Sequence, residues 1–213
     1  MFGRARQDVE GTVTAVVEGE ELRDRFVGAA LRVVAEHGPA GLTVRRVAEE
    51  AGSSTMGVYS RFGSRTGMLE ALYERAFAML RDAFARVPVT GDAAADVRAL
   101  ALAYRAFALE SPARYAFMFE RAVPGFDPGP RLRTEALGST FGVLAAAVGR
   151  AAAPQAAAHD AYLVWAVLHG TVGIELAHRE RTDLPGWSAA ADREGVYLDG
   201  LAALWRGLGL DGP

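Results

Sequence analysis

The sequence predicts an all-α protein of about nine helices, with an N-terminal three-helix helix-turn-helix head and a larger C-terminal helical bundle. Three observations support this fold class. Apolar residues recur at helical spacing along most of the 213 residues. No segment alternates polar and apolar residues long enough to indicate a strand. Alanine, the strongest helix former, is abundant, and runs of β-branched residues are few.

The head is expected within residues 20–66, after a mobile arm over residues 1–19, which shows no strong apolar periodicity. The first helix of the head has an apolar stripe that consists of Leu22, Phe26, Ala29, Ala30, Val33 and Val34. Each following helix begins after a Ser or Thr that can cap it, and each of the three head helices ends at a glycine. The expected caps are Thr43, Ser54 and Ser64, and the glycines are Gly38, Gly52 and Gly63.

The remaining helices are expected to form a second domain over residues 67–213. Their expected ranges are 65–87, 92–109, 112–122, 130–152, 155–181 and 188–208. Prolines and glycines separate these ranges, because proline cannot continue a helix and glycine favours its end.

Composition excludes several classes of chemistry. The chain has no cysteine, so disulfides, cysteine nucleophiles and cysteine-rich zinc sites are excluded. All 23 basic residues are arginines, which excludes a phosphate-loop lysine and a Schiff-base lysine. The four histidines lack the His-x-x-x-His spacing of a metal site. The sequence therefore predicts no catalytic residues, no cofactor and no metal, and the chain is not expected to be an enzyme.

The chain is also expected to be cytoplasmic and without a membrane partner. Residues 1–11 contain four charged residues and lack the apolar region of a signal peptide. The longest apolar stretch, residues 162–176, is interrupted by His169 and Glu175, so no membrane span is expected. The net charge of -3 argues against general coating of nucleic acid but allows a local basic patch.

Residues 43–62 contain the pattern with the clearest functional meaning. Two short helices joined by a turn at Gly52 form a helix-turn-helix pattern, with small Ala48 where the helices cross. The outer face of the second short helix carries small or polar residues, as a helix that enters a DNA groove requires. Between residues 43 and 65 there are four arginines and two glutamates, a local charge of about +2. This excess is too small to define a DNA site by itself.

The same stretch resembles the tetracycline-repressor (TetR) family of bacterial transcription regulators. The resemblance covers about residues 20–72 and depends on Gly41-Leu42-Thr43, on Ala48-x-x-Ala51-Gly52 and on Tyr59-x-x-Phe62-x-Ser64-Arg65. It implies that the third helix reads DNA and that Thr43, Tyr59 and Arg65 meet phosphates. The residues implied to contact DNA are Thr43, Arg45, Ser54, Thr55, Met56, Gly57, Tyr59, Ser60, Arg61 and Arg65. Met56 departs from the small residue usual at its position, and it can contact a thymine methyl group.

Residues 95–182 resemble the Trp-His-Gly type of TetR ligand-binding domain, through the segments 104–112, 115–119 and 162–170. The resemblance implies an apolar pocket for a small effector. Its expected lining is Tyr104, Phe107, Tyr115, Met118, Phe119, Phe141, Trp165 and His169. A plain core role for these aromatic residues stays open, and His169 can either bind a ligand or orient the adjacent helix.

The resemblance further implies a homodimer through the last two helices, whose two reading helices meet a palindromic double-stranded operator. Leu201 and Trp205 are among the residues expected at the dimer interface. The predicted function is a repressor that a small apolar or amphipathic ligand releases from this operator, with activation left open. The alternative is a helical small-molecule carrier or protein-interaction module without specific DNA binding. The operator, the regulated genes and the effector cannot be read from the sequence.

Overall fold

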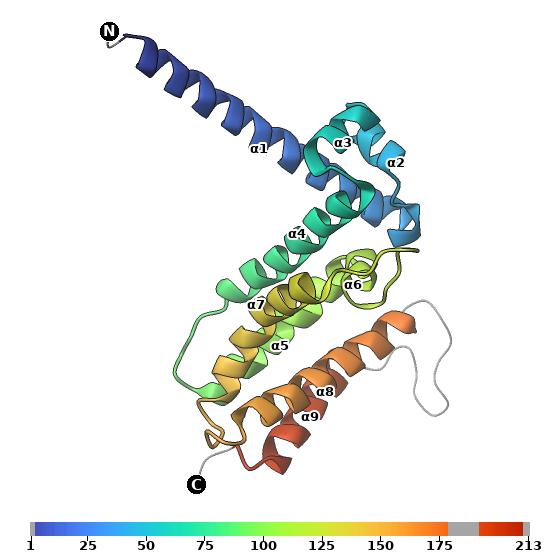
Figure 1. Cartoon of the computed structure of the whole chain (residues 1–213). Coiled ribbons are helices and arrows are strands. Elements are labelled where there is room, and N and C mark those ends of the chain that lie inside the picture. Colours follow the sequence, from blue (N-terminus) through green and yellow to red (C-terminus); the bar gives the residue numbers. More distant parts are fainter. Residues whose placement is uncertain (1–2, 179–191, 211–213) are drawn as a thin grey trace. The chain divides into compact units, whose positions relative to one another are not determined.

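A computed structural model describes the backbone of residues 3–178 and 192–210, and the side chains of these residues from Gly19 onward. Within these ranges the chain is all-helical, with nine α-helices and one 3-10 turn and no strand (Figure 1). The predicted fold class is therefore confirmed. The expected helix end at 181 and start at 188 lie outside the described residues. In the described part, no helix has both the length and the apolar character needed to cross a bilayer.

The chain divides into two compact units, which are described separately. The first unit contains Met1–Ala76 and Ala113–Gly129, and the second contains Phe77–Pro112 and Pro130–Pro213. The expected domain boundary at residue 66 falls inside a continuous helix. The segment 113–129, expected to belong to the ligand-binding domain, groups with the first unit and contacts the same helix through Arg65 and Tyr73.

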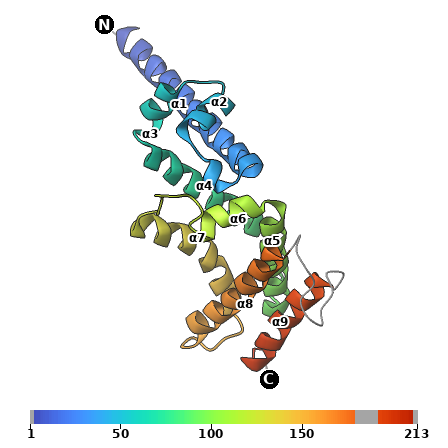
Figure 2. The same cartoon turned by 90° about the vertical axis from the view of Figure 1, so that its right-hand side faces the viewer.

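The first unit is built on α1 (Gly3–His37), against which α2 (Val44–Glu50) and α3 (Thr55–Phe62) pack (Figure 2). The 3-10 turn η1 (Pro39–Gly41) connects α1 to α2. The unit also contains the first part of α4 (Arg65–Ala85) and α6 (Pro112–Phe119). Its core side chains, which are almost fully buried, include Phe26, Val34, Leu42, Val47, Val58, Met68 and Leu72.

The second unit packs α5 (Ala93–Glu110), α7 (Pro130–Val148), α8 (Ala157–Ala177) and α9 (Arg193–Gly207) against one another. Both views show α8 and α9 side by side (Figures 1 and 2). Val97, Val164 and Val172 are fully buried between these helices. The phenol of Tyr197 on α9 is buried too, and it donates a hydrogen bond of 2.8 Å to the carbonyl of Ala101 on α5.

Several helix ends differ from the prediction, among them the ends of α7 at Val148 and of α8 at Ala177, each four residues early. The first helix begins at Gly3, so the segment predicted as a mobile arm forms the N-terminal part of α1 from residue 3 onward. Each residue added to an existing helix gains a backbone hydrogen bond, and no new nucleation step is needed. A helix can therefore continue through residues that have only weak apolar periodicity. In contrast, α6 ends at Phe119, three residues early, because Arg121 takes a φ of 52° just before the Pro124-Gly125 turn.

Candidate nucleic-acid interface

The start of α2 presents Thr43 and Arg45 on the surface of the first unit. The Thr43 hydroxyl accepts a hydrogen bond of 3.2 Å from the amide of Arg46, which confirms Thr43 as the helix cap. Arg45 is exposed, and its Nε donates to Glu49 Oε1 at 2.8 Å. This hydrogen bond raises the pKa of Arg45 above its ordinary value. Because an exposed ion pair is weak, a phosphate can replace Glu49 as the partner of Arg45.

The outward face of α3 contains most of the residues predicted to read DNA. Ser54 caps this helix by accepting a hydrogen bond of 3.2 Å from the amide of Gly57. Its exposed residues are Thr55, Met56, Tyr59, Ser60 and Arg61. Met56 is 78% exposed, although burial of its side chain would be favourable. The opposite face is anchored by Val58, which is fully buried. The helix therefore offers a polar surface that also exposes two large hydrophobic side chains, Met56 and Tyr59, three residues apart.

Gly57 does not lie on this outward face as the sequence prediction expected. A Cβ atom at Gly57 would lie 3.2 Å from Phe26 Cζ and 3.0 Å from Ser53 Oγ. The glycine thus allows α3 to approach α1 closely. Any contact of Gly57 with DNA would have to come from its backbone.

Three arginines of the head lie against the backbone of neighbouring segments. Arg46 Nη1 donates to the carbonyl of Gly41 at 3.2 Å. The guanidinium of Arg61 lies over Gly19 of α1, 2.9 Å from where a Cβ of that glycine would stand. Arg65, at the first position of α4, lies with Nη2 3.5 Å from the carbonyl of Pro124. Arg61 and Arg65 thus both lie against neighbouring backbone, at opposite ends of the α3–α4 junction.

One charge relevant to this surface was missed by the sequence prediction. Arg32 of α1 pairs with Glu50 at the end of α2, with 2.5 Å between Nε and Oε1. Because both acidic residues of the helix-turn-helix have an arginine partner, neither leaves an unpaired negative charge beside α3. Helical periodicity alone did not find this pair, since the two residues are eighteen positions apart in the chain.

In the second unit, the structure brings four of the predicted ligand residues together. Tyr104 Oη lies 2.7 Å from His169 Nδ1, and the His169 ring stacks on Trp165 with centroids 5.2 Å apart. Phe141 meets Trp165 edge to face at 6.4 Å. Burial lowers the pKa of His169, which favours the neutral form of its imidazole. These side chains contact one another, which suits an orienting role for His169 at least as well as ligand binding.

The other predicted ligand residues are distributed differently. Phe107 is buried in the second unit, whereas Tyr115, Met118 and Phe119 belong to the first unit. The rings of Tyr115 and Phe119 pack at 5.0 Å there. The same unit holds the stacked rings of Phe117 and Phe126, with centroids 5.9 Å apart. The aromatic residues of α6 therefore pack within the unit that carries the helix-turn-helix.

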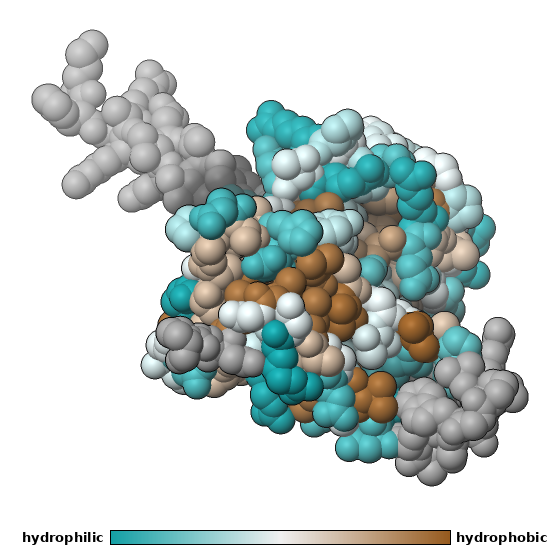
Figure 3. Space-filling view, turned by 90° about the horizontal axis from the view of Figure 1, so that it is seen from below, coloured by the Kyte–Doolittle hydropathy of each residue, from teal (hydrophilic) through white to brown (hydrophobic). Residues whose placement is uncertain are grey.

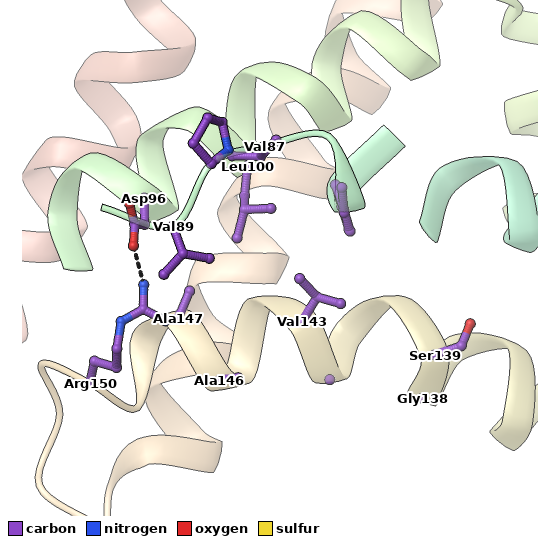
Figure 4. Close-up of a pocket in the computed structure, with 13 residues that line it drawn as sticks. Val87, Val89, Asp96, Leu100, Gly138, Ser139, Val143, Ala146, Ala147 and Arg150 are labelled. Carbon is purple, nitrogen blue, oxygen red and sulfur yellow. Dashed lines mark hydrogen bonds and ion pairs between the residues drawn. The ribbon is translucent and has the colours of Figure 1, made fainter. Parts of the chain in front are cut away.

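A groove in the second unit contains none of the eight predicted ligand residues. It lies between α5, α7 and the chain after α4, and has a volume of about 450 Å³ (Figure 4). Its walls are mostly small or aliphatic, including Val87, Leu100, Gly142, Val143 and Ala147. Sequence reasoning missed it because it searched for aromatic side chains. The available signal was the spacing of Gly138, Gly142 and Ala146 along one face of α7.

Within the described ranges, no three acidic or histidine side chains are placed to hold a metal ion. The arrangement in the first unit can instead bind a polyanion, through the capped start of α2, the exposed face of α3 and the arginine at the start of α4.

Comparisons with known proteins agree with this arrangement. A family model described as "Bacterial regulatory proteins, tetR family" matches residues 26–72. A second, described as "Tetracyclin repressor-like, C-terminal domain", matches residues 97–193, which includes most of the stretch with the Trp-His-Gly resemblance. The HTH-type transcriptional regulator Rv1816 of Mycobacterium tuberculosis is 31% identical over 136 residues, or 61% of this chain and 58% of that protein. The chain therefore aligns with less than two thirds of this relative's length.

Solved structures show the same fold. A Rhodococcus sp. RHA1 protein of unknown function has a TM-score of 0.72 and 26% identity, over 88% of this chain and 95% of that one. The transcriptional regulator FadR of Bacillus subtilis, solved in complex with stearoyl-CoA, has a TM-score of 0.65 and 14% identity, over 84% of this chain and 96% of that one. Together the two family models match well over half of the sequence. The chain belongs to the TetR family of bacterial regulatory proteins.

Proposed function

We propose that this chain is a sequence-specific DNA-binding transcriptional regulator, which represses from a palindromic operator until a small ligand releases it. The observation that supports this most strongly is the head itself. Thr43 and Ser54 cap two short helices, and α3 exposes Thr55, Met56, Tyr59 and Ser60 above a buried Val58. The TetR-family model matches this same stretch. In this geometry α3 enters the major groove and α2 crosses the backbone.

The roles within the proposed interface follow from where each group lies. Thr43 and Tyr59 meet phosphates, since both are exposed at the edges of the helix pair. Arg45 releases Glu49 and binds a phosphate, and Arg65 binds a second phosphate from the start of α4. Thr55 and Met56, at the exposed start of α3, touch base edges.

A homodimer through α8 and α9 is part of the proposal. Both helices expose large apolar side chains, namely Tyr162 and Ile174 on α8 and Val196 on α9. One face of the molecule shows apolar patches between hydrophilic side chains (Figure 3). Two of the residues expected at the interface, Leu201 and Trp205, are instead buried within the unit. A twofold dimer presents two copies of α3 about 34–36 Å apart, one turn of DNA.

The proposed release works through the shape of the dimer. A ligand bound in the second unit favours a dimer whose heads no longer match the operator, and its effect is set by its differential affinity for the two shapes. The FadR complex with stearoyl-CoA supports this step, because a regulator of the same fold binds an amphipathic molecule. A tenfold loss of DNA affinity needs about 1.4 kcal/mol of such preference.

Two variants test the proposed division of roles. Arg65→Ala is expected to weaken binding about tenfold on every duplex and to reduce the salt slope of log Kd by about one, because one phosphate contact is lost. Thr55→Ala is expected to change the relative affinities for different duplexes and to leave the salt slope unchanged. Fluorescence-anisotropy titrations over a salt series measure both quantities.

Arg98→Ala serves as the control, since it removes one exposed arginine from α5 in the second unit. It should leave affinity and slope as in the wild type. An unchanged slope for Arg65→Ala would refute its phosphate role. If the wild-type protein binds all duplexes with equal, weak affinity, the chain is instead a carrier or interaction module.

A further inference from the structure

The groove between α5 and α7 has a polar end and an apolar body. Figure 4 shows Leu100 and Val89 on one side and Val143 and Ala147 on the other, with Arg150 and Asp96 at one end. From Gly138 to Ala147 the groove follows α7 for about 14 Å, at 1.5 Å per residue, and Arg150 lies just beyond the end of this helix. Its volume of about 450 Å³ lies in the range of small-molecule sites. The shape therefore suits an elongated apolar molecule.

Glycine on α7 leaves the space for such a molecule. A Cβ atom at Gly138 or Gly142 would meet no other atom within 4 Å. These positions are open, in contrast to Gly57, where a Cβ would touch Phe26. A side chain added at Gly142, which lines the groove, would therefore begin in open space.

The polar end is held in place by Asp96, which is 3% exposed. One of its oxygens accepts hydrogen bonds from the amide and the hydroxyl of Thr90, at 2.9 and 2.7 Å. The other accepts from Arg150 Nη2. The hydrogen bonds from Thr90 hold the pKa of Asp96 below its ordinary value, so the carboxylate stays charged. Both oxygens of Asp96 thus accept hydrogen bonds, and Asp96 fixes the guanidinium of Arg150 beside the groove.

The N–H groups of Arg150 that do not bind Asp96 indicate which kind of ligand the groove accepts. A guanidinium has five N–H groups, and Asp96 is the one side-chain partner that the described residues give it. The side chain of Arg150 is 36% exposed, so the remaining donors are accessible. A cation would meet the positive charge of Arg150, and a neutral oxygen would accept a weaker hydrogen bond than a carboxylate.

We infer that this groove binds a medium-chain amphipathic carboxylate, with its chain between α5 and α7 and its carboxylate on Arg150. This names the effector class of the proposed regulator, and its regulatory meaning rests on that proposed function. The binding itself does not depend on DNA. The site differs from the aromatic cluster of Tyr104, Trp165 and His169, which contributes no residue to the groove.

Calorimetric titration of the full-length protein with decanoate and with the neutral probe decan-1-ol tests the inference. Arg150→Gln is expected to weaken decanoate binding at least tenfold and decanol binding less than threefold. Gly142→Leu is expected to weaken both at least tenfold, because its side chain occupies the groove. Arg131→Gln and Thr134→Leu change exposed positions of α7 that do not line the groove, and they are expected to bind like the wild type.

Two results would overturn the inference: no decanoate binding by the wild type at millimolar concentration, or wild-type affinity in Gly142→Leu or in Arg150→Gln. Circular dichroism of each variant verifies that its helices are intact. Failure of the proposed function is seen separately, as decanoate that binds in the groove but leaves DNA affinity unchanged.

Discussion

Gly67→Ala is expected to destabilise the first unit by about 1–3 kcal/mol and to reduce DNA affinity more than tenfold, although it adds a single methyl group. A Cβ at Gly67 would lie 2.3 Å from the carbonyl oxygen of Phe62, the last residue of α3. Because this obstacle is backbone, either the end of α3 or the start of α4 must move. The shift displaces α3 and Arg65 together, and both belong to the proposed interface.

Gly142→Ala is the matched control for this substitution. Gly142 is also helical, but its Cβ would be in open space. Replacing a helical glycine with alanine at such a place stabilises by about 0.4–1 kcal/mol. Urea unfolding followed by circular dichroism, with a DNA titration of each variant, makes the comparison. Wild-type stability and affinity in Gly67→Ala would show that the α3–α4 junction is looser than described.

Glu175→Ala is expected to destabilise the second unit by about 3 kcal/mol, because it leaves Arg105 without its main partner in a largely buried position. Arg105 Nε and Nη2 donate to the two oxygens of Glu175, both at 2.9 Å, with side chains 14% and 9% exposed. The hydrogen bond to Glu175 raises the pKa of Arg105, so the charge persists. Glu194 retains one bond to Arg105 at 2.8 Å, which keeps the loss at the lower end of the range for buried pairs.

Tryptophan fluorescence follows the unfolding of the second unit, because Trp165 and Trp205 lie in it and the segments of the first unit contain no tryptophan. Glu135→Ala breaks the exposed pair with Arg131 on α7 and is expected to cost about 0.5 kcal/mol or less. Equal losses of stability for Glu175→Ala and Glu135→Ala would show that the buried pair of Arg105 and Glu175 contributes no more than an exposed pair. The double replacement of Arg105 and Glu175 by methionine is expected to recover much of the loss, since no unpaired charge remains.

Features fixed by a few neighbouring residues were predicted from the sequence. Thr43, Ser54 and Ser64 each cap a helix through the amide three residues later, and such a contact depends on local sequence alone. The turn at Gly52 has a φ of 61°, which a residue with a side chain rarely adopts. The roles of the α3 residues came from the family resemblance, because helical periodicity does not indicate which residues contact DNA.

Features made by contacts distant in sequence were missed. Three such features depend on how helices pack: the pair of Arg32 with Glu50, the close approach of Gly57 to α1, and the grouping of segment 113–129 with the first unit. The groove is defined by side chains that are absent from Gly138 and Gly142, and an absent side chain gives little signal in a sequence. The predicted lining consisted mostly of aromatic residues and included Trp165 and His169, which contact each other.

The most direct test of the central claim is selection of bound duplexes from a random DNA pool by the full-length protein at near-physiological salt. The account predicts recovery of a palindrome whose half-sites lie about one helical turn apart, because a twofold dimer presents two copies of α3. Recovery of no common sequence, with equal retention of all duplexes, would contradict a sequence-specific regulator.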